Sequence, residues 1–356
     1  MFLSCQKWGC IKNKVDMHYD VTIGIPVYQV ENYIKRTMES VLSQTYPNIE
    51  FLVVDDGSTD KSLDIIKSLR SDHPRGSDIN IIVHDENKGV SEARNHIIDE
   101  AQGDYLYFID SDDMIAPNTI SLLMEQIKGK QADLAFGSYE RVEISGEKSL
   151  FQYPLSFFEE IDSFANYVYR KYAGFQASAC NYLVSLSLLR HHHLKFFKSD
   201  FWEDMIFTLD LATVAQRVVL LPNITYTYLC RENSLSNSWH NVIEKNQIIQ
   251  YFDAVNTLKS CSENQKKKSY YPNRCYFALV SDMYIICNVL KKWDYIHPSF
   301  AINELCDNLV HPSALKEILS FRQMRFQNLL FYIIGRLPSS ISLFLVQSYA
   351  KLKGYL

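Results

Sequence analysis

Four short apolar segments, each followed by a helical pattern, dominate the first 130 residues and restrict the fold more than any other feature of the chain. Branched and aromatic residues predict strands at four places, 21–26, 49–54, 79–84 and 105–109. Apolar residues at helical spacing predict helices at 32–44, 63–69, 91–101 and 117–127, with Ser91 as an N-cap and Pro117 in a first turn. Apolar strands joined by amphipathic helices pack as a mostly parallel sheet flanked by helices, so the predicted fold class is α/β.

The rest of the chain predicts further strands and a helical end. A strand is expected at 132–142, a helix over 203–215, and two separate strands in "RVVLL" and "ITYTYL". From about residue 241 the pattern is helical and rich in aromatic residues. The predicted organisation is a poorly ordered extension over 1–19, an α/β domain over 20–240 with halves 20–130 and 131–240, and a C-terminal helical region over 241–356.

Charge and cysteine content exclude several classes of protein. The net charge of -5 and the pI of about 6.1 argue against nucleic acid as a partner, which usually requires a basic surface. The eight cysteines match no zinc motif and are expected to be reduced, which predicts a cytoplasmic location. No segment has the roughly 18 uninterrupted apolar residues of a membrane span.

The segment from Ala314 to Leu356 combines bulky apolar residues with six basic residues and a single acid, Glu317. An apolar face edged by cations can lie on an anionic membrane surface, which would place the protein peripherally on the inner face of the membrane. The alternative is a helical cap that packs on the preceding domain. Both interpretations stay open at the level of sequence.

A short cluster of candidate residues follows each of the four predicted strands, where parallel sheets bind their ligands. The clusters are Pro26-Val27-Tyr28, Asp55-Asp56-Gly57-Ser58, Asn87-Lys88-Gly89 and Asp110-Ser111-Asp112-Asp113. Asp110 and Asp112 stand two apart, so both can supply hard oxygen ligands to one cation, for which Mn²⁺ or Mg²⁺ is the natural choice. The alternative is a solvated turn that caps the next helix, and Asp113 is expected to be only such a cap.

Charged residues near the other strand ends could act on a substrate. Asp55 and Asp56 can accept from a base N–H or a ribose hydroxyl, or can serve their turn alone. Arg94, expected in the first turn of its helix, favours an anion such as a pyrophosphate. The alternative for Arg94 is a surface ion pair with Glu92 or Asp99.

Two later clusters are candidates for catalysis and binding. Glu203 or Asp204 could act as a general base toward an acceptor hydroxyl, unless both acids only complement a helix dipole. The segment "CRENSLSNSWH" carries three further candidates, Arg231, Ser234 and His240. Of these, His240 could bind a metal or a phosphate, or could be a plain loop histidine. The run His191-His192-His193 has no nearby carboxylate and is expected to lie in a surface loop.

Taken together, these segments resemble the family 2 glycosyltransferases of the GT-A fold, in which a Rossmann-like sheet binds the donor. The resemblance rests on five blocks in order, "IPVYQVENYIKRTMESVLSQTYPNIEFLVVDDGSTDKS", "NKGVSEARN", "FIDSDDM", "WEDMIF" and "RENSLS". It extends from about Val21 to His240. It implies an inverting transfer of a sugar from a nucleoside diphosphate, most often UDP, to a glycan or lipid-linked acceptor, as in cell-surface polysaccharide synthesis.

The resemblance also implies roles for individual residues. Those expected around the nucleotide sugar are Pro26, Tyr28, Asp55, Asp56, Arg94, Asp110, Arg231 and Ser234. Asp112 is expected to hold Mn²⁺ or Mg²⁺, with Asp110 shared between ribose and metal and His240 as a further metal or diphosphate contact. Asp204 is the expected base, and Glu203 is expected to help place the sugar or acceptor.

Three other functions compete with this interpretation. A sugar nucleotidyltransferase requires a glycine-rich basic loop after the first strand, where this chain has "PVYQVEN". A dehydrogenase requires G-x-G-x-x-G at the same place, and that motif is absent. A non-catalytic nucleotide-sugar-binding protein remains the main alternative, and it predicts that Asp204 is dispensable.

Overall fold

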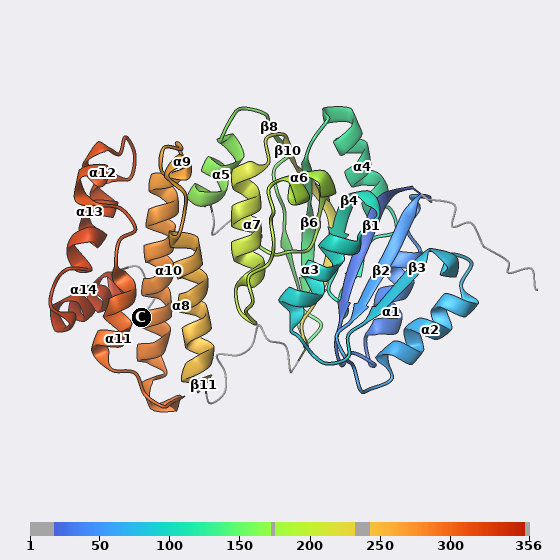
Figure 1. The fold of residues 1–356 in the computed structure, drawn as a ribbon, viewed down its shortest axis with the longest axis horizontal. Coiled ribbons are helices and arrows are strands. Elements are labelled where there is room, and N and C mark those ends of the chain that lie inside the picture. The colour runs from blue at the N-terminus through green and yellow to red at the C-terminus, as the bar shows by residue number, and fades with distance from the viewer. Residues whose placement is uncertain (1–17, 172–174, 232–242, 353–356) are drawn as a thin grey trace, which may run out of the picture.

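The computed structural model describes residues 18–171, 175–231 and 243–352. Most of the extension predicted over 1–19 lies outside these residues, but Tyr19 already belongs to the first strand. The chain folds into a large sheet with helices on both faces, followed by a layered group of helices that packs beside it (Figure 1). The predicted α/β fold with a helical C-terminal region is therefore confirmed.

The first half of the chain alternates between strands and helices. In order, its elements are β1 (Tyr19–Val27), α1 (Ile34–Leu42), β2 (Ile49–Asp55), α2 (Ser62–Asp72), the 3-10 helix η1 (Gly76–Asp78), β3 (Ile79–Val83), α3 (Val90–Glu100), β4 (Gly103–Phe108), β5 (Met114–Ile115) and α4 (Thr119–Lys130). The four predicted strands are all present. Seven successive residues of β2 are buried, as a strand covered on both faces requires.

The second half completes the sheet and adds the helical region. Up to residue 229 its elements are β6 (Leu134–Val142), β7 (Lys148–Phe151), β8 (Ser156–Phe158), α5 (Ser163–Lys171), β9 (Tyr182–Ser185), α6 (Leu186–His191), α7 (Glu203–Val214) and β10 (Val218–Leu229). The helical region contains β11 (Ile243–Glu244), α8 (Lys245–Lys259), α9 (Glu263–Lys266), α10 (Tyr271–Lys291), η4 (Trp293–Tyr295), β12 (Ile296–His297), α11 (Ile302–Cys306), η5 (Asp307–Leu309), α12 (Leu315–Ser320), α13 (Arg325–Ile334) and α14 (Ser339–Leu352).

Within the described residues, the large sheet has ten strands, with the central order β3-β2-β1-β4-β9-β6-β10-β5. Strands β1, β2, β3 and β4 are mutually parallel, as are β6 and β10. Strand β9 runs antiparallel between β4 and β6, and so joins the two parallel groups. Because β1, β2, β3 and β4 are parallel, their carboxyl ends lie at one edge of the sheet.

Several local predictions are corrected by the structure. The segments "RVVLL" and "ITYTYL" form one strand, β10, whose pairing with β6 shifts register between Leu220 and Ile224 instead of breaking. Pro117 precedes α4 and does not lie in its first turn. Ser91 is not an N-cap, because Gly89 occupies that position with a φ of 95° and the Ser91 hydroxyl donates to the Ser199 carbonyl at 2.9 Å.

The helical region is held to the α/β domain by an arginine that water hardly reaches. Arg274 of α10 is 2% exposed. Its guanidinium donates to Asp210 of α7 at 2.7 Å, to the Tyr169 hydroxyl at 2.8 Å and to the Leu258 carbonyl at 2.9 Å. A buried arginine with three acceptors fixes the position of α7 relative to α8 and α10. Among the described residues, no helix is long and apolar enough to cross a membrane.

Candidate active site

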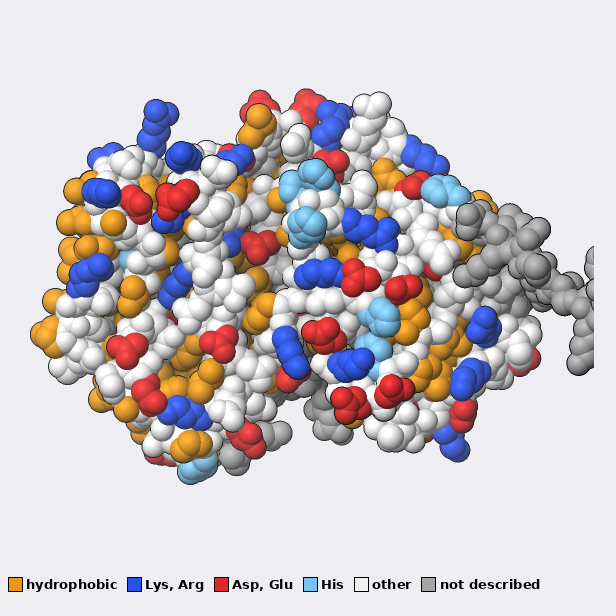
Figure 2. All heavy atoms as spheres, viewed as in Figure 1, with side chains coloured by type: hydrophobic (Ala, Val, Ile, Leu, Met, Phe, Trp, Pro, Cys, Tyr) orange, Lys and Arg blue, Asp and Glu red, His pale blue; other side chains and the backbone are white. Residues whose placement is uncertain are grey.

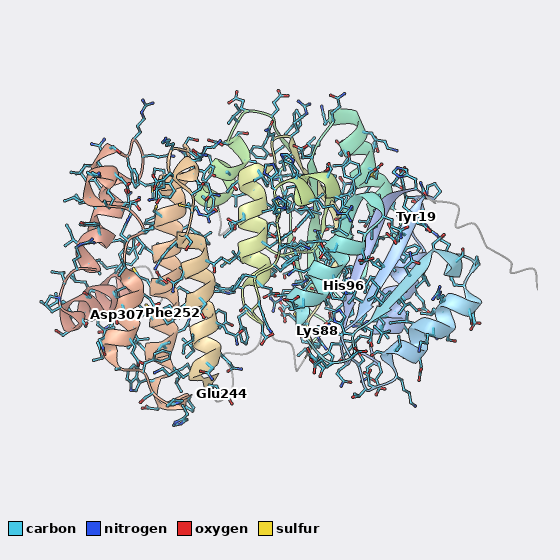
Figure 3. All side chains as sticks on the ribbon, in the orientation of Figure 1. Tyr19, Lys88, His96, Glu244, Phe252 and Asp307 are labelled. Carbon is cyan, nitrogen blue, oxygen red and sulfur yellow. The ribbon has the colours of Figure 1, made fainter. Side chains whose placement is uncertain are left out.

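The clusters that follow β1, β2 and β3 begin at the same level of the sheet. Val27 pairs with Asp55 across β1 and β2, and Asp55 pairs with Val83 across β2 and β3. In Figure 3, Lys88 lies at the lower edge of the sheet and His96 lies higher on α3. The loops that leave these strands are therefore neighbours, as the order of strands and helices predicted.

Asp56 organises the loop between β3 and α3. Its two carboxylate oxygens accept from the backbone N–H groups of Lys88 at 3.0 Å and Gly89 at 2.8 Å. The same carboxylate lies 2.6 Å from Nδ1 of His84. Because the side chain is 96% buried and these contacts occupy both oxygens, Asp56 holds the backbone of this loop in place. The predicted contact between Asp56 and a nucleoside stays a prediction.

Asp55 differs from Asp56 in having an oxygen without a protein partner. Its Oδ2 accepts from the Ser58 N–H at 3.3 Å, which supports the turn as expected. Its Oδ1 is buried and has no hydrogen-bond partner. Gly57 lies at the turn with a φ of 74°, and an added Cβ would come within 2.8 Å of the Glu86 backbone. The turn therefore requires glycine, and it leaves a buried acceptor at the strand end.

Arg94 joins three parts of the chain that are far apart in sequence. Its guanidinium donates to Glu203 of α7 at 2.7 Å and to Asp110, after β4, at 2.9 Å. It also lies over the Phe196 ring, 5.4 Å from the centroid. The surface pairs with Glu92 or Asp99 are not formed, and Arg94 is the fifth residue of α3, beyond the first turn. Two carboxylates raise the pKa of this buried guanidinium above its ordinary value despite its burial.

The segment that leads into α7 is tied down from two sides. Asn95 of α3 forms two hydrogen bonds of 2.8 Å with the Phe196 backbone. Gln250 of α8 accepts from the Asp200 N–H at 2.9 Å and from the Ser199 hydroxyl at 3.2 Å. The bonds from Asn95 and Gln250 both hold residues just before Glu203. They therefore fix the place where α7 begins.

The turn after β4 gathers three carboxylates, and each has a different environment. Asp110 pairs with Arg94, whereas Asp112 pairs with Arg231, whose Nε lies 2.5 Å from Oδ2. Asp113 does not cap a turn: it accepts from the Tyr226 hydroxyl at 2.6 Å and from the Leu229 N–H at 2.8 Å, and so anchors the turn to β10.

Burial and mutual repulsion disfavour the charge on two of these carboxylates. Burial, and then the charge of Asp110, raise the pKa of Asp112, against a smaller opposing effect of Arg231. Burial, Asp110 and Asp112 together raise the pKa of Asp113 well above its ordinary value. Such a cluster favours a further cation, and its oxygen donors are those that Mg²⁺ and Mn²⁺ prefer. Within the described ranges, no three His, Cys, Asp or Glu side chains form a complete metal site.

Asp204 stands in the first turn of α7, next to Glu203. Burial, and then the charge of Glu203, raise its pKa to about 7, while Arg94 opposes that rise. Its Oδ1 accepts from the Met205 N–H at 2.6 Å. A carboxyl group with a pKa near neutrality can take a proton from a substrate and later release it to water.

Aromatic side chains from the helical region pack against Trp202, which directly precedes Glu203 and Asp204. Trp202, with a φ of 59°, lies against Tyr251 of α8 with ring centroids 4.9 Å apart. Tyr284 of α10 stacks near Trp202, at 6.4 Å between centroids. Tyr284 is 44% exposed, although its neighbours on α10 from Ser281 to Cys287 are buried. The helical region therefore contributes one exposed ring, Tyr284, beside Trp202, the residue that directly precedes Glu203.

Comparison with known proteins places this geometry in a family. Residues 22–191 match the family model described as glycosyl transferase family 2. This part of the chain is a family 2 glycosyltransferase domain. The match contains Asp55, Arg94 and Asp110, but stops before Asp204.

Relatives and solved structures agree with this assignment. The chain is 33% identical over 227 residues to the glycosyltransferase GlyA of Streptococcus pneumoniae, which covers 62% of this chain and 32% of GlyA. It is 27% identical to the poly(ribitol-phosphate) beta-glucosyltransferase of Bacillus spizizenii, over 70% of this chain and 38% of that protein. The chain thus spans about a third of the length of these two relatives.

The fold of the domain and of its helical region also has a solved counterpart. The crystal structure of S. aureus TarS 1-349 in complex with UDP-GlcNAc superposes with a TM-score of 0.64 at 18% identity. The superposition covers 89% of this chain and 90% of that one. At this identity the likeness concerns the GT-A fold alone.

The glycosyltransferase domain brings together most of the residues predicted for its site. Asp110, Arg94 and Glu203 form one network, with Asp204 beside it and Asp112 bound to Arg231. Pro26 is buried within β1, and Tyr28 is 44% exposed at the end of that strand. Ser234 and His240 lie outside the described residues. The histidine run His191-His192-His193 is exposed at the end of α6, as expected.

Sequence reasoning missed several residues that shape this site. Arg36 and Thr37 of α1 donate to the backbone carbonyls of Asp112 and Ser111, at 3.1 and 3.0 Å. His84 connects Asp56 to His96, because Nε2 of His84 lies 2.9 Å from Nδ1 of His96. A cleft of about 550 Å³ opens beside the turn, and its lining includes Arg36 and Arg231. A lone arginine on a helix has no periodic or spacing signal that would reveal such a contact.

Proposed function

We propose that the protein is an inverting glycosyltransferase that moves a sugar from a nucleoside diphosphate sugar, a UDP-sugar in the first instance, to an acceptor hydroxyl. The observation that carries the proposal is the network in which Arg94 joins Asp110 at the strand end to Glu203, next to Asp204. It connects residues suited to binding a donor with a carboxylate suited to deprotonating an acceptor. Membership of the domain in glycosyl transferase family 2 supports the same reaction class.

The donor side of the proposal rests on the strand ends of β1, β2 and β4. The unpartnered Oδ1 of Asp55 is an acceptor for a base N–H, and the exposed Tyr28 ring lies at the end of the adjacent strand. Structures of TarS, whose fold is similar, contain UDP-GlcNAc and UDP. These observations favour a uridine nucleotide.

The residues after β4 fit a divalent cation. Asp112 and Asp110 would hold Mn²⁺ or Mg²⁺, because their like charges raise the free energy of the ligand-free turn and their oxygens match the preference of both ions. When bound there, the ion would stabilise the negative charge of the departing diphosphate. A role for His240 as a further ligand stays a prediction from the sequence.

Asp204 is the proposed general base. Its carboxylate takes the proton of the acceptor hydroxyl as that oxygen bonds to the anomeric carbon from the side opposite the diphosphate. The bond between the anomeric carbon and the phosphate oxygen breaks, and its electron pair leaves with the diphosphate. One such displacement inverts the anomeric centre without a covalent intermediate. Glu203, held by Arg94, fixes the start of α7 and so positions Asp204.

The acceptor is proposed to be a glycan or a lipid-linked sugar. Trp202 precedes the two acids directly, and Tyr284 offers an exposed ring beside it. Flat aromatic faces pack well against the C–H surfaces of sugar rings, and their phenol and indole groups donate hydrogen bonds. An acceptor sugar that stacks on this surface would reach Asp204 with one hydroxyl.

A donor screen tests the proposal. Thermal stabilisation by UDP-, GDP- and dTDP-sugars with Mn²⁺ identifies the donor, and release of the nucleoside diphosphate then measures turnover. We expect stabilisation by a UDP-sugar, and loss of turnover on addition of EDTA or in Asp112→Ala. Turnover that survives both changes contradicts the metal assignment.

The same assay separates an enzyme from a binding protein. Asp204→Asn is expected to bind the donor normally and to release diphosphate roughly 10²- to 10⁴-fold more slowly. The matched control Asp253→Asn replaces an exposed carboxylate on α8 and should keep wild-type turnover. Normal turnover in Asp204→Asn would exclude this residue as the base. Donor binding without turnover in the wild type, across a broad acceptor panel, would favour the non-catalytic alternative.

A further inference from the structure

The C-terminal helices expose apolar side chains along one side of each helix. Phe326, Leu330 and Ile333 recur at helical spacing on α13 and are 82%, 47% and 48% exposed. On α14, Ile341, Phe344 and Leu352 are 47%, 66% and 86% exposed. These six residues are called the apolar face below. Isolated apolar residues are normal on a surface, but six on two consecutive helices are not.

The opposite sides of α13 and α14 explain why the apolar face points outward. Phe331 of α13 packs against Tyr276 of α10, with ring centroids 5.8 Å apart. The hydroxyl of Tyr349, on α14, lies 3.3 Å from the hydroxyl of Tyr276. Both helices therefore bury their other side on α10. In Figure 1 they form the end of the molecule farthest from β3, so the apolar face lies away from the sheet.

The segment that carries the apolar face contains exposed cations and no acidic residues. Arg322, Arg325, Arg336 and Lys351 are all exposed, and no Asp or Glu occurs between Ile318 and Leu352. The rest of the chain is acidic overall, because the whole protein carries a net charge of -5. Figure 2 shows hydrophobic side chains with Lys and Arg among them, and some Asp and Glu, along the edge formed by α12 to α14. The positive charge is thus concentrated where the apolar side chains are exposed.

We infer that the apolar face of α13 and α14 docks on an anionic membrane surface. Apolar side chains at this spacing enter the boundary between headgroups and acyl chains, while the surrounding arginines and lysine stay at the level of the lipid phosphates. The cations around the apolar face distinguish a membrane from a second copy of this chain as the partner of that face. A second copy of this chain would bring like charges together on a symmetric face, whereas an anionic bilayer offers the opposite charge.

Membrane docking would also serve the proposed reaction, although it does not depend on it. An enzyme that rests on the bilayer meets lipid-linked acceptors in two dimensions. The catalytic site lies on the α/β domain and the docking face on the outer helices, so each can be removed without the other. A variant that loses membrane binding should therefore keep turnover of a water-soluble acceptor.

Vesicle sedimentation with the full chain tests the inference. We expect the protein to pellet with vesicles of phosphatidylcholine containing phosphatidylglycerol, and to stay in solution with vesicles of phosphatidylcholine alone. Binding should weaken sharply in 1 M salt, because charges are then screened within about 3 Å. Absence of binding to the anionic vesicles, or equal binding to both kinds, overturns the inference.

Paired variants separate the apolar and charged contributions. Phe326→Ser with Phe344→Ser should weaken vesicle binding at least about tenfold, since two large side chains lose their apolar environment. Arg322→Gln with Lys351→Gln should weaken it about fivefold for each cation removed. The matched control Leu150→Ser with Ile161→Ser changes apolar residues of similar exposure on the α/β domain, 64% and 79%, and should bind like wild type.

The mass of the protein in solution tests the main competing occupant. Light scattering is expected to give a monomer for the wild type and for both pairs of variants. A wild-type dimer that becomes a monomer in Phe326→Ser with Phe344→Ser would show that a second copy covers the apolar face, and would overturn the membrane assignment. Circular dichroism confirms that the variants keep their helices.

Discussion

Replacing Asp204 by Asn is expected to remove transfer and, at neutral to basic pH, to stabilise the ligand-free protein. The carboxylate of Asp204 is partly buried beside Glu203, and these surroundings raise its pKa from 3.8 to about 7. The native protein therefore binds this proton more tightly than the unfolded chain does. As pH rises from about 4 to about 7, ionisation of Asp204 lowers the stability of the wild type, whereas the amide of Asn cannot ionise.

The size of this stability difference follows from the pKa shift of Asp204. Moving a carboxyl pKa from 3.8 to about 7 corresponds to about 4 kcal/mol of lost stability above pH 7, an upper value because water reaches part of the side chain. A chain of 356 residues unfolds with an entropy near 0.75 kcal/mol/K, at about 2.1 cal/mol/K per residue. The melting temperature of Asp204→Asn should therefore exceed that of wild type by up to about 5 °C at pH 8.

Thermal unfolding at pH 5 and pH 8 measures this difference directly. At pH 5, about 1.2 units above the unfolded-state pKa of 3.8, roughly a third of this loss is already present, so Asp204→Asn should melt about 2 °C above wild type, a smaller gap than at pH 8. The exposed Asp253→Asn reports how much the buffer change itself contributes. A gap between Asp204→Asn and wild type that is equal at both pH values, or reversed at pH 8, would refute the reasoning. The same ionisation predicts that wild-type kcat/KM rises as pH increases toward 7, since only the carboxylate can act as the base.

Two further substitutions test how the site is held together. Arg94→Met removes the partner of the buried Glu203 and should destabilise the protein by about 3–5 kcal/mol, which thermal unfolding measures. Arg94→Lys should recover part of that loss. An unchanged melting temperature in Arg94→Met would contradict the role of this arginine. Arg274→Met breaks the buried contact between α10 and α7, and a similar loss of stability is expected. Its effect on kcat should be smaller than that of Asp204→Asn. The opposite order would mean that α7 is positioned in another way.

The parallel α/β arrangement could be predicted because its signals are local. Strands such as β2 are buried on both faces and therefore read as continuous apolar runs, and the helices between them keep one apolar side. The single β10 could not be predicted, because its irregularity at 220–224 leaves two apolar runs that look like separate strands. The Gly89 cap was missed for a similar reason: whether a serine caps a helix depends on competing partners, and Ser91 bonds instead to Ser199, 108 positions away.

The amino-acid sequence alone determined which residue types stand at the ends of the strands, and hence the chemistry that this edge of the sheet can perform. Asp55, Asp110 and Asp112 follow apolar runs, and short runs of this kind decide where a chain leaves a sheet. Only the tertiary structure decided their partners. Arg94 bonds to Glu203 across 109 positions, and Arg231, which follows β10, pairs with Asp112, which follows β4. Side-chain pairing at such separations depends on how whole helices pack, and no local pattern encodes it.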